Sequence, residues 1–302
     1  MIHRKKNKIK ISTGERIFDI FNNSLMFLLM IIMVYPVWYV LAASFSDSNA
    51  LMGYSGFLVF PRGFSFASYK MMAQNPMVLK SYINTIYLVV MKLIFNITFT
   101  SMGAYCLSRK NVFWQKYVMI FIVITMYVSG GMIPTYLVNT KLYGLNNSYW
   151  ALILPGAINT YNMIVLKTAF AAIPDSLIES ARIDGATQNR VLFSIVLPLA
   201  KATLAVIVLY YAVAHWNAWF NASIYLTDRG KYPLQLVLRE ILIANDTSSM
   251  TSGSIDAGSD QQAIGETIKY ATIVVATAPI LCVYPFLQKY FAKGTMVGAV
   301  KE

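Results

Sequence analysis

The chain has 302 residues, of which 57% are hydrophobic and only 13% are charged. Soluble domains carry roughly a quarter of their residues as charges, so this composition excludes an ordinary water-soluble globule and favours a membrane domain. The formal net charge of +12 would indicate a nucleic-acid partner in a soluble protein. Here the basic residues lie mainly at the ends of apolar runs, where they set membrane orientation, so no nucleic acid is expected.

The N-terminal tail is basic and precedes the first apolar run. Its sequence MIHRKKNKIK leads into residues 25–43, a run longer than the ~7–15-residue apolar core of a cleaved signal peptide. We therefore predict an uncleaved first helix that begins near residue 20, after a basic cytoplasmic tail over residues 1–19.

The apolar runs predict an all-α integral membrane protein with six transmembrane helices. A helix needs about 20 apolar residues to cross the hydrocarbon, and the backbone of each run must be helical because lipid offers it no partners. The runs cover about residues 20–45, 83–107, 117–138, 150–170, 202–226 and 268–291. They predict a transmembrane domain over residues 20–291 and a cytoplasmic C-terminal tail over residues 292–302.

The distribution of Lys and Arg predicts how these spans are oriented. The two terminal tails, the loop 108–116 and the segment 167–201 hold most of the basic residues outside the spans. Because Lys and Arg concentrate in cytoplasmic segments, we expect both termini to be cytoplasmic. The loops 46–79 and 227–267 would then face the outside.

The segment 173–198, IPDSLIESARIDGATQNRVLFSIVLP, is too polar to cross a bilayer. Pro174 suits the first turn of a helix, and Gly185 can take the left-handed backbone that ends one. Thr187 can cap a second helix, and Pro198 marks the bend into the fifth span. Three apolar residues of the first helix are expected on one face: Leu177, Ile178 and Ala181. The segment predicts two short cytoplasmic helices joined at a glycine.

This segment resembles the cytoplasmic signature of the permeases of binding-protein-dependent ABC importers. The family pattern is E-A-A, three residues, G, nine residues, I, one residue and L-P. Here Glu179-Ser180-Ala181 is followed at the same spacing by Gly185, Ile195 and Leu197-Pro198, with Ser180 as the one departure. The chain therefore looks like a permease of that family.

The resemblance implies that the helix before the glycine docks into a groove on a separate ATP-binding subunit. Two such subunits would bind ATP and magnesium, and their closure would move the permease between inward-facing and outward-facing states. No catalytic residue, metal or cofactor is expected on this chain itself. The implied coupling residues are Glu179, Ser180, Ala181, Arg182, Asp184, Gly185 and Pro198.

Within the family, the chain is similar to the smaller permease of maltose-type importers and to oligosaccharide and polysaccharide-fragment permeases of Gram-positive bacteria. The stretch GGMIPTYLVNTKLYGLNNSYWALILPGAINTYN and the tail QKYFAKGTMVGAVKE carry this likeness. It implies a second permease, two ATP-binding subunits, an extracellular substrate-binding (lipo)protein and a carbohydrate substrate, in the bacterial cytoplasmic membrane. It also implies that the tail touches the ATP-binding subunits through Gly294, Gly298, Ala299, Val300 and Lys301.

Sugars are bound by hydrogen bonds and by the flat faces of aromatic rings, so polar and aromatic residues within spans are candidates for the substrate pathway. In the predicted fifth span, Asn217 and Asn221 are four apart and share one face, as do Trp216 and Phe220. Asn159 and Asn162, with Tyr161 beside them, are weaker candidates in the fourth span. Hydrogen bonds between helices or an aromatic belt at the outer surface remain alternatives for these residues.

Three polar residues of the second span are less clear. Asn84 and Asn96 are weak candidates for sugar contact. Lys92 lies in mid-span, where an ammonium is costly unless it faces a cavity or a polar partner. A structural role for Lys92 is therefore favoured, with a role in the pathway left open.

Two other classes of protein fit the sequence less well than an importer permease does. A secondary transporter tends to carry broken spans and intramembrane acids, and no Asp or Glu lies well inside a predicted span. An intramembrane protease could use Ser55 in the sequence GYSG with His215 as its base, but this serine is expected in a loop outside the membrane. No P-loop is present for ATP binding.

Overall fold

The computed structural model describes residues 12–109, 113–244, 267–283 and 285. All regular elements in these ranges are helices, and the only strand-like pairing there is an isolated bridge between Ser46 and Phe64. The prediction of an all-α protein is confirmed. The chain divides into two compact units, Met1–Met72 with Thr251–Val274 and Ala73–Met250 with Val275–Glu302.

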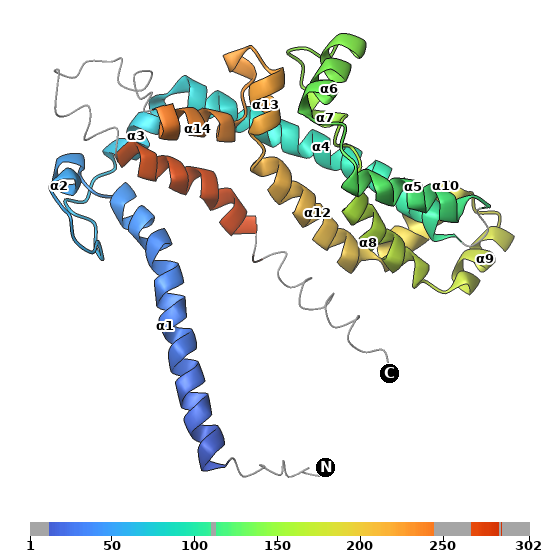
Figure 1. Ribbon diagram of the computed structural model, residues 1–302, viewed down its shortest axis with the longest axis horizontal. Helices are drawn as coiled ribbons and strands as arrows, with labels where there is room; N and C mark the ends of the chain where they lie inside the picture. Colours follow the sequence, from blue (N-terminus) through green and yellow to red (C-terminus); the bar gives the residue numbers. More distant parts are fainter. Residues whose placement is uncertain (1–11, 110–112, 245–266, 284, 286–302) are drawn as a thin grey trace. The chain divides into compact units, whose positions relative to one another are not determined.

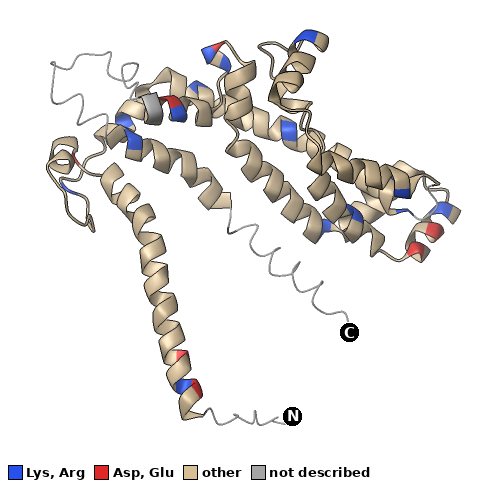
Figure 2. Cartoon of the chain, in the orientation of Figure 1, with Lys and Arg blue, Asp and Glu red and all other residues tan. Residues whose placement is uncertain are grey.

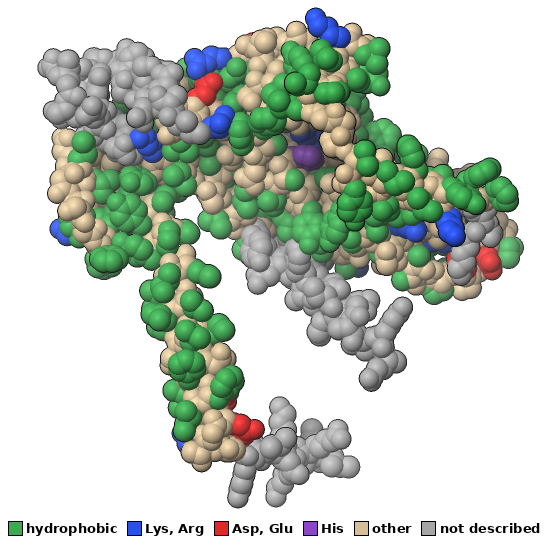
Figure 3. Space-filling model, in the orientation of Figure 1, with side chains coloured by type: hydrophobic (Ala, Val, Ile, Leu, Met, Phe, Trp, Pro, Cys, Tyr) green, Lys and Arg blue, Asp and Glu red, His purple; other side chains and the backbone are tan. Residues whose placement is uncertain are grey.

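The first unit is dominated by helix α1 (Thr13–Ser44), which is 32 residues long. Ser12 and Glu15 form a capping box, so the helix begins before the apolar run and earlier than residue 20. Figure 3 shows hydrophobic side chains along α1, most of them exposed. Such a helix is long and apolar enough to cross a membrane.

The rest of this unit folds back beside the end of α1. A short helix, α2 (Ser48–Met52), follows α1. The loop after α2 returns to α1, where the indole Nε1 of Trp38 donates to the carbonyl of Val59, with 2.8 Å between the two atoms. The rings of Tyr39 and Tyr270 meet edge to face at 5.9 Å, which places residues 267–274 of this unit beside α1. A short helix, α3 (Ala67–Gln74), leads towards the next long one.

Three helices form the centre of the second unit: α4 (Pro76–Ser108), α8 (Thr160–Ala171) and α12 (Lys201–Trp216) (Figure 1). Their shared core includes the fully buried side chains of Leu166, Phe170 and Ile207. The second predicted span is a single long helix, α4. Asn75 caps the start of this helix and Pro76 occupies its first turn.

The third predicted span is not one helix, which corrects the prediction. It consists of α5 (Gln115–Tyr127), α6 (Met132–Leu137) and the π-helix η1 (Val138–Leu142). The two parts are bent by 111°. Gly131 has φ of 86° at the break, a backbone conformation that glycine adopts without steric cost.

The fourth predicted span is also broken. It consists of α7 (Trp150–Ile153) and α8, separated by a non-helical stretch over residues 154–159. Pro155 in this stretch has no N–H to continue the helix, and Gly156 follows it. Asn159 then caps α8 by accepting a hydrogen bond from the backbone N–H of Asn162.

The fifth predicted span ends early as a helix. After an 89° bend, α12 runs for 16 residues and stops at Trp216. Residues 217–219 are not helical, and α13 (Phe220–Tyr225) follows. The chain then continues through the 3-10 turn η3 (Arg229–Lys231) to α14 (Leu234–Ala244).

Six uninterrupted spans are therefore not what the described residues contain. Two helices, α1 and α4, are each long and apolar enough to cross a membrane, and the number rises to four if each bent pair counts as one span. The helix Thr267–Val283 is apolar but shorter, and residues 286–291 of the sixth predicted span lie outside the described residues.

Candidate functional site

The two short helices predicted at residues 173–198 are present and meet at Gly185. The first is α9 (Asp175–Ile183); the second begins as α10 (Gln188–Val191) and continues through η2 (Leu192–Val196) and α11 (Leu197–Leu199). We call this segment, residues 174–199, the elbow. Its bend towards α12 lies at Ala200, two residues beyond Pro198, which had been expected to mark it.

Gly185 ends α9 through a pair of backbone hydrogen bonds. The N–H of Gly185 donates to the carbonyl of Arg182 at 3.0 Å, and the N–H of Ala186 donates to the carbonyl of Ala181 at 2.9 Å. This is the Schellman arrangement, which needs a residue with positive φ. Gly185 has φ of 80° and no neighbouring atom that a Cβ would meet, so backbone conformation alone accounts for the glycine.

The elbow has an apolar side and a polar side. Ile178 is 3% exposed and packs in the same core cluster as Val191 and Val196. Leu177 is 46% exposed, so the expectation that it shares the face of Ile178 is wrong. Successive residues of a helix are rotated by about 100°, so Leu177 lies to one side of the buried face that Ile178 occupies. Ala181 is half-buried, and the exposed coupling candidates are Glu179, Ser180, Arg182, Asp184, Gly185 and Pro198.

Charged side chains gather on the outward side of the elbow, as Figure 2 shows at α9. Ile183, at the end of α9, is 86% exposed among them.

The C-terminal end of α4 holds the elbow at two points. Tyr105 donates its hydroxyl to Oε1 of Gln188 at 2.7 Å, and Arg182 reaches the same oxygen at 3.3 Å. Arg109 donates to the carbonyl of Phe170 at 2.9 Å and pairs with Asp175 at 3.5 Å. Neither tie was predicted from the sequence, since the partners are far apart along the chain.

The predicted sugar face of the fifth span does not exist as one helical face. Asn217 caps the end of α12 and donates to the carbonyl of Val213, whereas Asn221 belongs to α13. The helix breaks between them, so the four-residue spacing no longer aligns their side chains. The same break separates Trp216, which is buried and donates to the carbonyl of Ala276, from Phe220, which is 48% exposed.

A buried polar network that the sequence did not reveal joins α4, α12 and the break in the fourth span. Asn96 is fully buried and donates to the carbonyls of Gly156 at 2.7 Å and Ala157 at 3.2 Å. Its oxygen lies 3.0 Å from Nε2 of His215. Unpaired carbonyls within a membrane are costly, so Asn96 compensates for the helix that Pro155 interrupts.

The hydroxyl of Tyr211 extends this network. It lies 2.8 Å from Oγ1 of Thr100 and accepts a hydrogen bond at 3.0 Å from the backbone N–H of Asn159. The signal that was available is spacing: Asn96 and Thr100 are four apart on α4, as Tyr211 and His215 are on α12. The candidates Asn159 and Asn162 thus lie at the edge of this network, with Asn162 itself buried.

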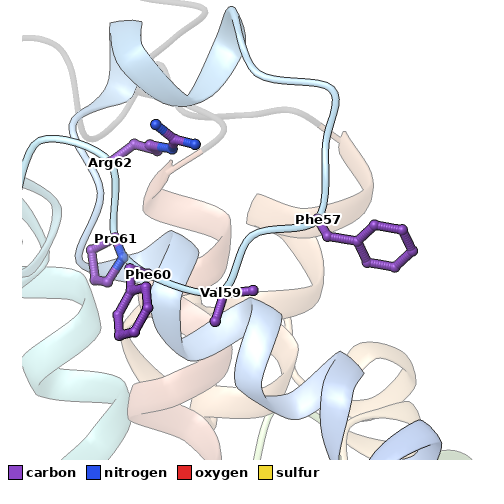
Figure 4. A pocket seen from close by; sticks show the side chains of 5 residues that line it. All are labelled: Phe57, Val59, Phe60, Pro61 and Arg62. Atoms are coloured by element: carbon purple, nitrogen blue, oxygen red, sulfur yellow. The ribbon is translucent and has the colours of Figure 1, made fainter.

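Other expected or possible sites lie elsewhere. The tail residues Gly294 to Lys301 are outside the described residues. A cavity of about 380 Å³ lies among residues 57–62 of the first unit, where the ring of Phe57 points away from the other lining side chains (Figure 4). It contains none of the predicted site residues. Within the described ranges, no group of three or more His, Cys, Asp and Glu side chains could hold a metal ion.

Comparisons with known proteins are consistent across most of the chain. The model of the family described as "binding-protein-dependent transport system inner membrane component" matches residues 96–297. The polygalacturonan/rhamnogalacturonan transport system permease protein YtcP of Bacillus subtilis is 42% identical over 95% of this chain and 99% of its own length. The B. subtilis protein LplC is 41% identical over 95% of both chains.

A solved structure is similar over a comparable length. It is a chain from a bacterial ABC transporter involved in the import of the acidic polysaccharide alginate. The TM-score is 0.84 and the sequence identity is 30%, with 94% of this chain and all of the other covered.

Proposed function

The chain belongs to the family of binding-protein-dependent transport system inner membrane components, and from that premise we propose that it is the permease subunit of an ATP-driven importer that carries an oligosaccharide into the cytoplasm. The observation that carries the proposal is the elbow. A short helix with a buried apolar side, an exposed charged side and a glycine stop is tied to the end of α4, where a push on α9 would be passed to a membrane helix.

The proposed topology has six membrane crossings, with both termini and the elbow in the cytoplasm of a bacterial cell. The transmembrane domain would cover residues 20–291 between the two cytoplasmic tails. The placement of Lys and Arg along the chain supports this orientation. The breaks in the third, fourth and fifth crossings are compatible with it, because irregular backbone is tolerated at membrane depth where protein or a water-filled passage surrounds it.

The proposed partners follow from the kind of transporter. Two ATP-binding subunits would dock on the elbow and hold ATP and magnesium, so this chain would do no covalent chemistry. The docking residues are Glu179, Ser180, Ala181, Arg182, Asp184 and Gly185, with Ile183 as the apolar contact and Pro198 at the far end. A second permease would complete the passage, and a substrate-binding (lipo)protein would deliver the sugar from outside. The tail residues Gly294, Gly298, Ala299, Val300 and Lys301 would add a second contact with the ATP-binding subunits.

The names of the relatives support a carbohydrate substrate. YtcP is named for polygalacturonan and rhamnogalacturonan transport, and the similar solved structure for alginate import. In this chain the exposed side chains of Asn217, Phe220 and Asn221 could line a passage shared with the second permease. Trp216, Asn159 and Asn162 would hold the backbone of that passage in place.

The test is ATP-dependent uptake by the purified complex. The complex, with its binding protein, would be reconstituted into liposomes, and the sugar that co-purifies with the binding protein would be identified by mass spectrometry. Accumulation of that sugar inside the vesicles, dependent on ATP, is expected. Transport that persists without ATP-binding subunits and responds instead to an ion gradient would overturn the proposal.

A further inference from the structure

We propose that the ammonium of Lys92 receives a carboxylate of an acidic oligosaccharide as it passes through the permease. This inference rests on the proposed function and narrows its substrate class to sugars that carry uronate groups. It begins from a charge that nothing in the described part of the chain neutralises.

Lys92 lies on the buried face of α4, one turn from Asn96 and two turns from Thr100. Only 8% of the residue is exposed. A charged side chain in the middle of a membrane helix is costly, and it is kept where it pairs with an opposite charge or faces a passage for solutes.

No opposite charge lies beside it among the residues that the structure describes. The carboxylates there are engaged or placed elsewhere: Asp175 pairs with Arg109, and Glu240 with Arg229. Asp47 caps α2, Asp228 caps η3, Glu15 belongs to the capping box of α1, and Asp19 is exposed on α1. Glu179 and Asp184 are on the exposed side of the elbow. The nearby His215 can only be neutral or positive, so it cannot serve as the counter-ion.

The ammonium is open to a group from outside the chain. Among described side chains, the only polar atom that is both sealed from the surface and without a hydrogen-bond partner is Oγ of Ser101. Lys92 makes no hydrogen bond there, yet its nitrogen is not in that sealed class. The nitrogen of Lys92 therefore keeps some contact with solvent, near His215 of the network with Asn96 and Tyr211.

The chemistry of the site favours a carboxylate over a sugar hydroxyl. Amides and phenols bind neutral sugar hydroxyls well, because burying these groups does not require desolvation of a full charge. The desolvation cost of a buried ammonium is offset chiefly by a bound anion. Uronate carboxylates are the anions that an acidic polysaccharide fragment brings.

The experiment uses two probes that differ only in charge: trigalacturonate and its carboxyl-reduced, neutral counterpart. ATP-dependent uptake of each is measured in liposomes with the complete complex and its binding protein. For Lys92→Met we expect uptake of trigalacturonate to fall about ten-fold or more, the loss typical of one charge-assisted hydrogen bond. Lys92→Arg, which keeps the charge, should restore most of it. Lys80→Met, on the same helix, is the matched control and should leave uptake unchanged.

The alternatives give different results. Equal loss for both probes, or no loss, would overturn the inference and leave the importer intact. If Lys92→Met failed to assemble with the second permease, the counter-ion would be a partner carboxylate, and the inference would also be wrong. Uptake of only the neutral probe by the wild-type complex would contradict the inference alone. Uptake of neither probe nor any sugar would count against the proposed function as well.

Discussion

The elbow and the interior of the fourth and fifth crossings differ in where their structure comes from. In the elbow, Gly185, Thr187 and the buried Ile178 act within a few residues of one another along the chain. In the crossings, the fold depends on partners far apart, such as Asn96 with Gly156 and His215. The comparison shows that local chemistry specifies the part proposed to dock on the ATP-binding subunits. Long-range hydrogen bonds specify the part through which a solute would pass.

The largest effect is expected at the stop of α9. Gly185→Pro replaces a residue at φ of 80° by one restricted to about −65°, so the Schellman turn cannot form. Uptake should be lost while the protein still inserts in the membrane, as judged by its level in membrane fractions. Gly130→Ala, with open space around it and an ordinary φ, is the control. Normal uptake in the proline variant would remove the elbow from the coupling mechanism.

A second test separates the two sides of the elbow. Ile178→Ala leaves a cavity in the core cluster and should lower the free energy of unfolding by about 2–5 kcal/mol. Thermal unfolding of the purified complex measures the change. Ile183→Ala should leave stability unchanged, because that side chain is 86% exposed, and should instead weaken co-purification of the ATP-binding subunits. Equal destabilisation by both would contradict the division into a buried and a docking side.

The buried network is tested at its centre. Asn96→Leu leaves the carbonyls of Gly156 and Ala157 without their donor, and should cost about 1–3 kcal/mol of stability. The same unfolding measurement applies, with Asn221→Leu, an exposed asparagine in the same unit, as the control. An unchanged unfolding temperature for Asn96→Leu would mean that the break in the fourth crossing is held by other contacts.

The smallest effect is expected from one tie between α4 and the elbow. Tyr105→Phe removes the hydrogen bond to Gln188 and nothing else, so transported sugar per ATP hydrolysed should fall about two- to ten-fold. ATP hydrolysis and uptake are measured together in liposomes. Tyr127→Phe, at a side chain that is 84% exposed, should leave that ratio alone. A parallel fall in hydrolysis and uptake would indicate a folding defect rather than weaker coupling.

By itself, the sequence determined the class of the protein and the elbow. Hydrophobic runs predict helices in lipid because the backbone has no other partners there, and the turn at Gly185 is a local requirement of backbone geometry. The continuity of the crossings was decided only by the tertiary structure. Pro155-Gly156 and Gly130-Gly131 are signals of breaks, but the prediction of continuous spans rested on the apolar runs and did not use them. The side chains that make such breaks tolerable, Asn96 above all, come from other helices, and no pattern along one helix shows which distant carbonyl they will reach.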